Sequence, residues 1–78
     1  MSKEAVGVGT VASEIGWLLA HKPGDQHSVS EQELLMDFYT NFGLTEDEAK
    51  YAITMAERCG LITRKTVQGE TRCAISQR

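Results

Sequence analysis

The sequence predicts one small α+β domain, mainly helical, in which three helices precede a β-hairpin. The length of 78 residues leaves room for a single thin core. Three stretches have apolar residues at intervals of three and four, and a C-terminal stretch from 61 to 76 changes to β-rich runs around a glycine. We expect residues 1–9 to form a flexible N-terminal arm and residues 10–76 to form the domain.

The first helix is predicted to begin at Thr10, whose hydroxyl can cap it, and to stop before Pro23 and Gly24. Gly16 inside it indicates either a closely packed neighbour or a tolerated loss of about 1 kcal/mol. Trp17 lies one position off the apolar stripe, where it packs at the core edge or anchors a dimer, and His21 is expected to close the helix as a cation. The stripe consists of Val11, Ala12, Ile15, Leu18 and Leu19.

The second helix follows a short extended segment at residues 27–29 and begins with a predicted capping box of Ser30 and Glu33. Gly43 is expected to end it in the left-handed conformation. Its periodic apolar positions are Leu34, Leu35, Phe38, Tyr39 and Phe42. The aromatic residues either enlarge the core through Phe38 and Phe42 or leave a partner-binding face, formed by Met36, Tyr39 and Tyr51.

The third helix is predicted to start at a second capping box, residues 45–48, and to end at Gly60. Its expected buried positions are Ala49, Ala52, Ile53, Ala56 and Cys59. We expect Cys59 and Cys73 to be reduced thiols in the core, since two cysteines without close spacing form neither a disulfide framework nor a metal knuckle.

Residues 61–67 and 70–76 flank Gln68 and Gly69 and are predicted to form a hairpin with a two-residue turn. The resulting pairs are Val67 with Glu70, Lys65 with Arg72, Arg64 with Cys73 and Ile62 with Ile75. Lys65 therefore faces Arg72, and like charges in this position are destabilising. Either an anion such as a phosphate lies beside them, or both side chains extend into water.

Charge is distributed unevenly along the chain. Residues 1–59 hold four cations against ten acids, a net charge of −6, whereas residues 60–78 hold four cations against one acid, a net charge of +3. Such polarity fits a molecule that touches an anion with one edge, and it also fits a solvated face without a partner.

The predicted order of helix, extended segment, helix, tight turn, helix and hairpin resembles a winged helix-turn-helix domain over residues 10–76. Gly43, Leu44 and Thr45 resemble the turn of that superfamily, residues 57–62 resemble the exit from its recognition helix, and Gln68 and Gly69 resemble the wing tip. The resemblance implies a sheet of two or three strands. It also implies a third helix in the DNA major groove and a wing on the flanking phosphates.

By this resemblance the nucleic-acid-binding residues are those of the third helix and the wing, namely Lys50, Tyr51, Thr54, Arg58, Arg64, Lys65, Gln68 and Arg72. The wing cations suit phosphate. The three acids at residues 46–48 depart from the pattern, because at the helix start they would face phosphate and repel it, and helix capping is sufficient to explain them.

Two functions follow from these observations. The first is a DNA-binding transcriptional regulator that contacts phosphates with its wing and dimerises through the first helix and the N-terminal arm. The second is an acidic protein-interaction module with a basic partner and no DNA, as an adaptor, a subunit of a complex or an inhibitor from a phage or mobile element.

An enzyme is not expected, because the sequence holds no nucleophile–base pair, phosphate loop or ligand cluster. Accordingly we predict no catalytic residue, no cofactor and no metal, since His21 and His27 would meet a cysteine only by accident of the fold. With no apolar run of membrane-spanning length and no signal-peptide core, the expected location is cytoplasmic, away from any membrane.

Overall fold

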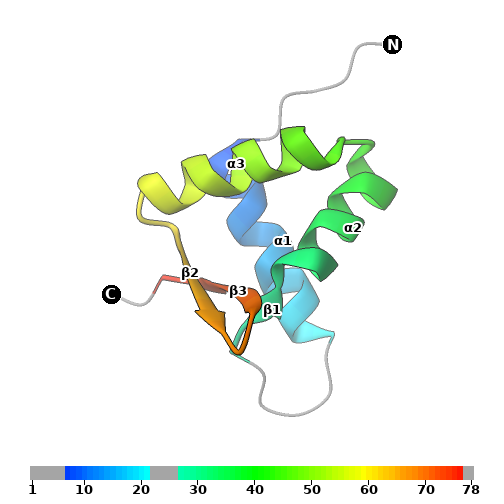
Figure 1. The fold of residues 1–78 in the computed structure, drawn as a ribbon. Coiled ribbons are helices and arrows are strands. Elements are labelled where there is room, and N and C mark those ends of the chain that lie inside the picture. Colours follow the sequence, from blue (N-terminus) through cyan, green and yellow to red (C-terminus); the bar gives the residue numbers. More distant parts are fainter. Residues whose placement is uncertain (1–6, 22–26, 77–78) are drawn as a thin grey trace.

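The computed structural model describes residues 7–21 and 27–76. It contains three helices and a three-stranded antiparallel sheet, which confirms the predicted α+β class (Figure 1). The elements in chain order are α1 (Val8–Ala20), β1 (Val29–Ser30), α2 (Glu31–Phe42), α3 (Glu46–Arg58), β2 (Ile62–Val67) and β3 (Glu70–Ile75). The predicted stop at Pro23 and Gly24 lies outside the described residues. No helix in the described part of the chain has the length and apolar character needed to cross a bilayer.

Helix α1 begins earlier than the sequence predicted. Gly7 is the N-cap, in an extended conformation and without a side-chain cap, so the assignment of this role to Thr10 was wrong. The helix extends to Val8 because this side chain packs against the core one turn before Val11. Residues 8 and 9, assigned to the flexible arm, therefore belong to the helix, and residues 1–6 lie outside the described part.

The C-terminal end of α1 is closed by His21. Its Nδ1 donates a hydrogen bond to the Trp17 carbonyl over 2.8 Å, and the two rings stack with their centroids 4.2 Å apart. Trp17 itself remains 52% exposed. The position of His21 at the helix end is thus as predicted.

The N-cap residues predicted for α2 and α3 are confirmed, and the structure shows the Ser30 half of the capping box predicted for α2. The Ser30 hydroxyl accepts a hydrogen bond from the Glu33 amide, and Gly43 takes the left-handed conformation with φ of 70°. The Thr45 amide donates to the Glu48 carboxylate over 2.9 Å, while the Glu48 amide donates to the Thr45 hydroxyl over 3.2 Å, so the capping box is complete. Gly60 has φ of 80° and turns the chain toward β2.

The sheet has the strand order β1-β3-β2. All four predicted cross-strand pairs of the hairpin are present, including Ile62 with Ile75 and Lys65 with Arg72. The turn residues Gln68 and Gly69 both have positive φ, as a two-residue hairpin turn of type I′ requires. Strand β1 pairs Val29 with Cys73, which adds the third strand that the resemblance allowed.

The core lies between the helices and one face of the sheet. Its fully buried large side chains are Val11, Ile15, Val29, Leu34, Phe38, Ile53, Ile62 and Cys73. Burial raises the pKa of the Cys73 thiol to about 11. Cys59 is exposed, contrary to prediction, because it lies at the C-cap of α3, beyond the last buried residue Ala56. Tyr39 and Phe42 are also exposed rather than part of the buried stripe.

Candidate functional site

Arg64, predicted to contact phosphate, is held by carboxylates of its own chain. Its Nη2 lies 2.8 Å from Glu57 Oε1, its Nε donates to the same oxygen over 2.9 Å, and its Nη1 lies 3.2 Å from Glu31 Oε2. Nη2 also donates to the Thr54 hydroxyl over 3.5 Å. Although burial opposes the charged form, the hydrogen bonds to Glu57 and Glu31 raise the pKa of Arg64. The side chain therefore connects α2, α3 and β2.

Arg72 is held in a similar way on the other face of the hairpin. Its Nε donates to the Ser28 hydroxyl and its Nη2 to the Ser28 carbonyl, both over 2.8 Å, and its Nη1 binds Glu70 over 2.9 Å. These contacts direct the guanidinium toward Ser28 and Glu70, so that only Lys65 of the like-charged pair is exposed. The Lys65–Arg72 pair therefore needs no external anion to explain it.

The other predicted site residues are distributed over α3 and the hairpin tip. Lys50 forms an ion pair of 2.9 Å with Glu46, and this hydrogen bond raises the pKa of Lys50. Tyr51 and Gln68 are exposed, whereas Thr54 is half-buried beside Arg64. Arg58 and Lys65 are exposed cations without a carboxylate partner among the described residues. Three of the five predicted cations are thus neutralised by their own chain.

Four carboxylates, one at the start of α2 and three along α3, lie around Lys50 and Arg64. They are Glu31, Glu46, Asp47 and Glu57, which we call the acidic face. Lys50 lies within the electrostatic influence of Glu46, Glu31 and Asp47, and Arg64 binds Glu57 and Glu31. The four carboxylates therefore surround only two cations. This surface attracts a cation and opposes phosphate.

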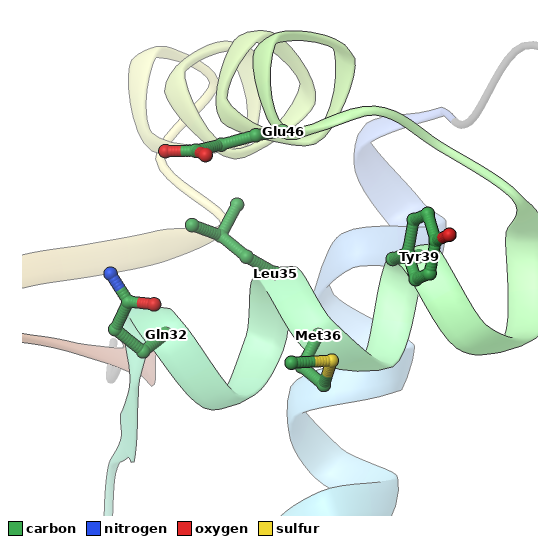
Figure 2. Close-up of a pocket in the computed structure, with 5 residues that line it drawn as sticks. All are labelled: Gln32, Leu35, Met36, Tyr39 and Glu46. Atoms are coloured by element: carbon green, nitrogen blue, oxygen red, sulfur yellow. The ribbon is translucent and has the colours of Figure 1, made fainter.

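A groove runs between α2 and the start of α3. Its lining residues are Gln32, Leu35, Met36 and Tyr39 of α2 and Glu46 of α3, and its volume is about 270 Å³. Figure 2 shows Leu35 directed from α2 toward α3, with Glu46 across from it. Met36 and Tyr39 are 64% and 67% exposed. We call this feature the α2–α3 groove.

Of the two alternatives that the sequence raised for the aromatic residues, the core role is confirmed for Phe38, whereas Phe42 is exposed. Phe38 is fully buried and packs edge-on against Phe42, with ring centroids 5.3 Å apart, so it enlarges the core. Met36 and Tyr39 line the groove on the exposed side, whereas Tyr51 is exposed without lining it. Sequence reasoning did not assign Gln32 or Leu35 to an exposed binding surface. The available signal was the apolar spacing 35, 36 and 39, which widens the stripe of α2 beyond the core-facing side.

Two carboxyl groups face each other between α1 and α2, and sequence reasoning missed them as well. Glu14 Oε2 and Asp37 Oδ2 are buried and have no hydrogen-bond donor, while Asp37 Oδ1 accepts from Asn41 over 2.7 Å. The hydrogen bond that a protonated Glu14 can donate to Asp37, together with burial and the charge of Asp37, raises the pKa of Glu14 to about 7. The Glu14 carboxyl therefore keeps its proton to a higher pH in the folded chain than in the unfolded chain. The signal was Glu14 itself, an acid inside the apolar stripe of Val11, Ile15 and Leu18.

Among the described residues, no three His, Cys, Asp or Glu side chains are grouped so that they could hold a metal ion. His21 contacts Trp17, and His27 lies beside Thr63 and Ala74 in a different hollow.

The order of helices and strands is compatible with a winged-helix topology. Comparison of the chain with protein-family models, with curated proteins and with solved structures found no match.

Proposed function

We propose that this chain is a winged helix-turn-helix protein that binds another protein through its acidic face. The observation that carries the proposal is the pairing of Arg64 with Glu57 and Glu31. This pairing holds one of the three hairpin cations against carboxylates of its own chain, while Glu46 and Asp47 stay exposed at the start of α3. A partner with a basic surface complements such a face and associates faster through charge attraction. The roles that fit are adaptor, complex subunit or small inhibitor.

The location proposed for this interaction is the cytoplasm. Cys59 and Cys73, the two cysteines of the chain, are free thiols. Free thiols fit a reducing compartment.

Duplex DNA is the second candidate ligand, and Arg58 and Lys65 support it because both are exposed without a carboxylate partner in the described part of the chain. In this case the protein is a transcriptional regulator whose hairpin contacts phosphates. Arg64 and Arg72 would contact phosphate only after breaking their hydrogen bonds to Glu57 and Ser28. DNA binding would therefore be weak and strongly salt-dependent. A dimer through α1, with half-exposed Trp17 at its contact, belongs to this candidate.

Two parallel measurements test the proposal. Nuclease-treated lysate of the source cells is passed over immobilised wild type and over the double variant E46K/D47K, whose fold is checked by circular dichroism. We expect a protein retained by the wild type and lost with the variant. Retention by both would show that the acidic face is not the interface.

The second measurement is a fluorescence-anisotropy titration with mixed-sequence duplex DNA. We expect no binding at physiological salt. Binding with a log–log salt slope near −2 or steeper, equivalent to about two or more phosphates, and its loss in R58A/K65A would replace the protein-binding proposal with the DNA-binding one.

A further inference from the structure

The α2–α3 groove combines an apolar wall with a carboxylate wall. We infer that it is the docking site for a basic amphipathic helix of the partner, with one or two large apolar side chains in the groove and a lysine or arginine at Glu46. This inference rests on the proposed function and deepens it by naming the site and the chemistry of the partner segment.

The exposed part of the apolar wall, Met36 and Tyr39, lies outside the core of this domain. Leu34 and Phe38 point into the core and are fully buried, whereas Met36 and Tyr39 are more than 60% exposed. Leu35, 8% exposed, provides the floor of the groove. Leu35 and Met36 each lie about one helical turn before Tyr39, so all three side chains line the same groove. An exposed methionine and tyrosine over a buried leucine form an adaptable apolar contact surface.

The carboxylate wall has capacity for a further cation. Glu46 is the first residue of α3, and its side chain is 63% exposed even though it pairs with Lys50. Lys50 is also influenced by Asp47 and by Glu31, and Arg64 binds Glu31 and Glu57, so two cations lie among the four carboxylates of the acidic face. A second ammonium or guanidinium group at Glu46 would therefore be attracted, whereas a carboxylate or phosphate would be repelled.

The volume of the groove and the charge around it together determine which kind of partner segment fits. A volume of about 270 Å³ admits one or two large side chains, not a whole secondary-structure element. The groove is therefore suited to the anchor residues of a helix that lies across it, spaced three or four positions apart. The acidic face extends from Glu46 to Glu57 along α3, which requires that the flanks of this helix be basic. An acidic helix or a nucleic acid fails this requirement.

The first test uses three synthetic helical peptides of about 16 residues, long enough to be helical. One has a leucine stripe and lysine flanks, the second replaces the lysines with glutamate, and the third replaces the leucines with glutamine. Each is titrated into ¹⁵N-labelled protein at pH 7 and 150 mM salt. We expect saturable binding of the leucine–lysine peptide, with amide shifts centred on residues 32–39 and 46, and at least tenfold weaker binding of the other two.

Variants identify the site within the same experiment. Met36→Gln and Tyr39→Gln replace exposed groove residues with a good helix former, so the fold is retained. Val67→Gln and Trp17→Gln are matched controls, because each removes an exposed apolar side chain outside the groove. We expect the M36Q/Y39Q variant to bind the leucine–lysine peptide at least tenfold more weakly than wild type, and each control to bind within twofold of it.

Three results would overturn the inference: shifts centred elsewhere, equal binding of the glutamine–lysine peptide, or unchanged binding by M36Q/Y39Q. The lysate experiment separates it from the proposed function. If wild type and M36Q/Y39Q retain the same partner equally while E46K/D47K does not, the acidic face is the interface and the groove is not. If M36Q/Y39Q loses the partner while the controls keep it, the groove is the docking site. If wild type retains no partner, both proposals fail.

Discussion

At the residue scale, the facing carboxyl groups of Glu14 and Asp37 make stability depend on pH. The pKa of Glu14 is about 7 in the folded chain, against an ordinary 4.5, so the folded state binds more protons than the unfolded state between these values. The stabilisation is complete below about pH 4.5 and is lost as the pH rises through 7. Because Glu14 is partly exposed, we expect a loss of about 1–2 kcal/mol rather than the full shift.

Urea unfolding of wild type and Glu14→Gln between pH 4.5 and 8 measures this effect. The glutamine amide can donate to Asp37, so the variant should be at least as stable as wild type at pH 8. The stability difference between the two proteins isolates the pair from all other titrating groups. A difference that does not change with pH would show that folding does not raise the pKa of Glu14.

Gly16 provides a second prediction at this scale. A Cβ atom added there would lie 3.6 Å from Ile75 Cδ1, an ordinary contact distance, so the neighbouring strand leaves room for a methyl group. Gly16→Ala should therefore stabilise the protein by about 0.5–1 kcal/mol through helix propensity. Gly43→Ala is the opposite control, because φ of 70° at that position disfavours any side chain. Thermal unfolding distinguishes them, and a lower melting temperature for Gly16→Ala would mean that Ile75 cannot accommodate the methyl group.

At the scale of elements, Arg64 connects β2 to both α2 and α3. Its removal leaves Glu31 and Glu57 unpaired, and Glu31 is only 17% exposed at its side chain. Arg64→Gln should destabilise the fold by about 1–3 kcal/mol. Lys65→Gln removes the same charge from the next, exposed position and should change stability by less than about 0.5 kcal/mol. Equal effects of the two substitutions in urea unfolding would contradict the proposed bridging role of Arg64.

The elements themselves were predictable where local rules determine them. Both N-caps of α2 and α3, the αL glycines at 43 and 60 and the hairpin register follow from neighbouring residues, and all are present. The start of α1 was missed because Gly7 has no capping side chain to reveal it. The partners of Arg64 were missed for a different reason: Glu31 lies 33 positions away in sequence, and only the packing of α2 against the sheet brings the two together. The predicted nucleic-acid-binding residues are consequently less basic in the fold than the sequence indicated.

At the scale of the whole molecule, two properties oppose DNA binding: the net negative charge and the positions of the carboxylates. The sequence contrasts an acidic body with a basic C-terminal end, but folding places Arg64 against Glu31 and Glu57, so this polarity is partly cancelled within the molecule. What remains at the start of α3 is negative. The position of these carboxylates, more than the net charge of −3, should therefore determine the affinity of the protein for phosphate.

Two variants with equal net charge test this point. E46Q/D47Q and S13K/T40K both change the net charge from −3 to −1, the first at the start of α3 and the second at exposed positions of α1 and α2. In anisotropy titrations with mixed-sequence duplex DNA at about 20 mM salt, where phosphate attraction is least screened, E46Q/D47Q should gain at least threefold more affinity than S13K/T40K, although the latter adds two cations. Equal gains, or a larger gain for S13K/T40K, would mean that total charge sets the weak affinity for DNA and that the acidic face has no special part in excluding it.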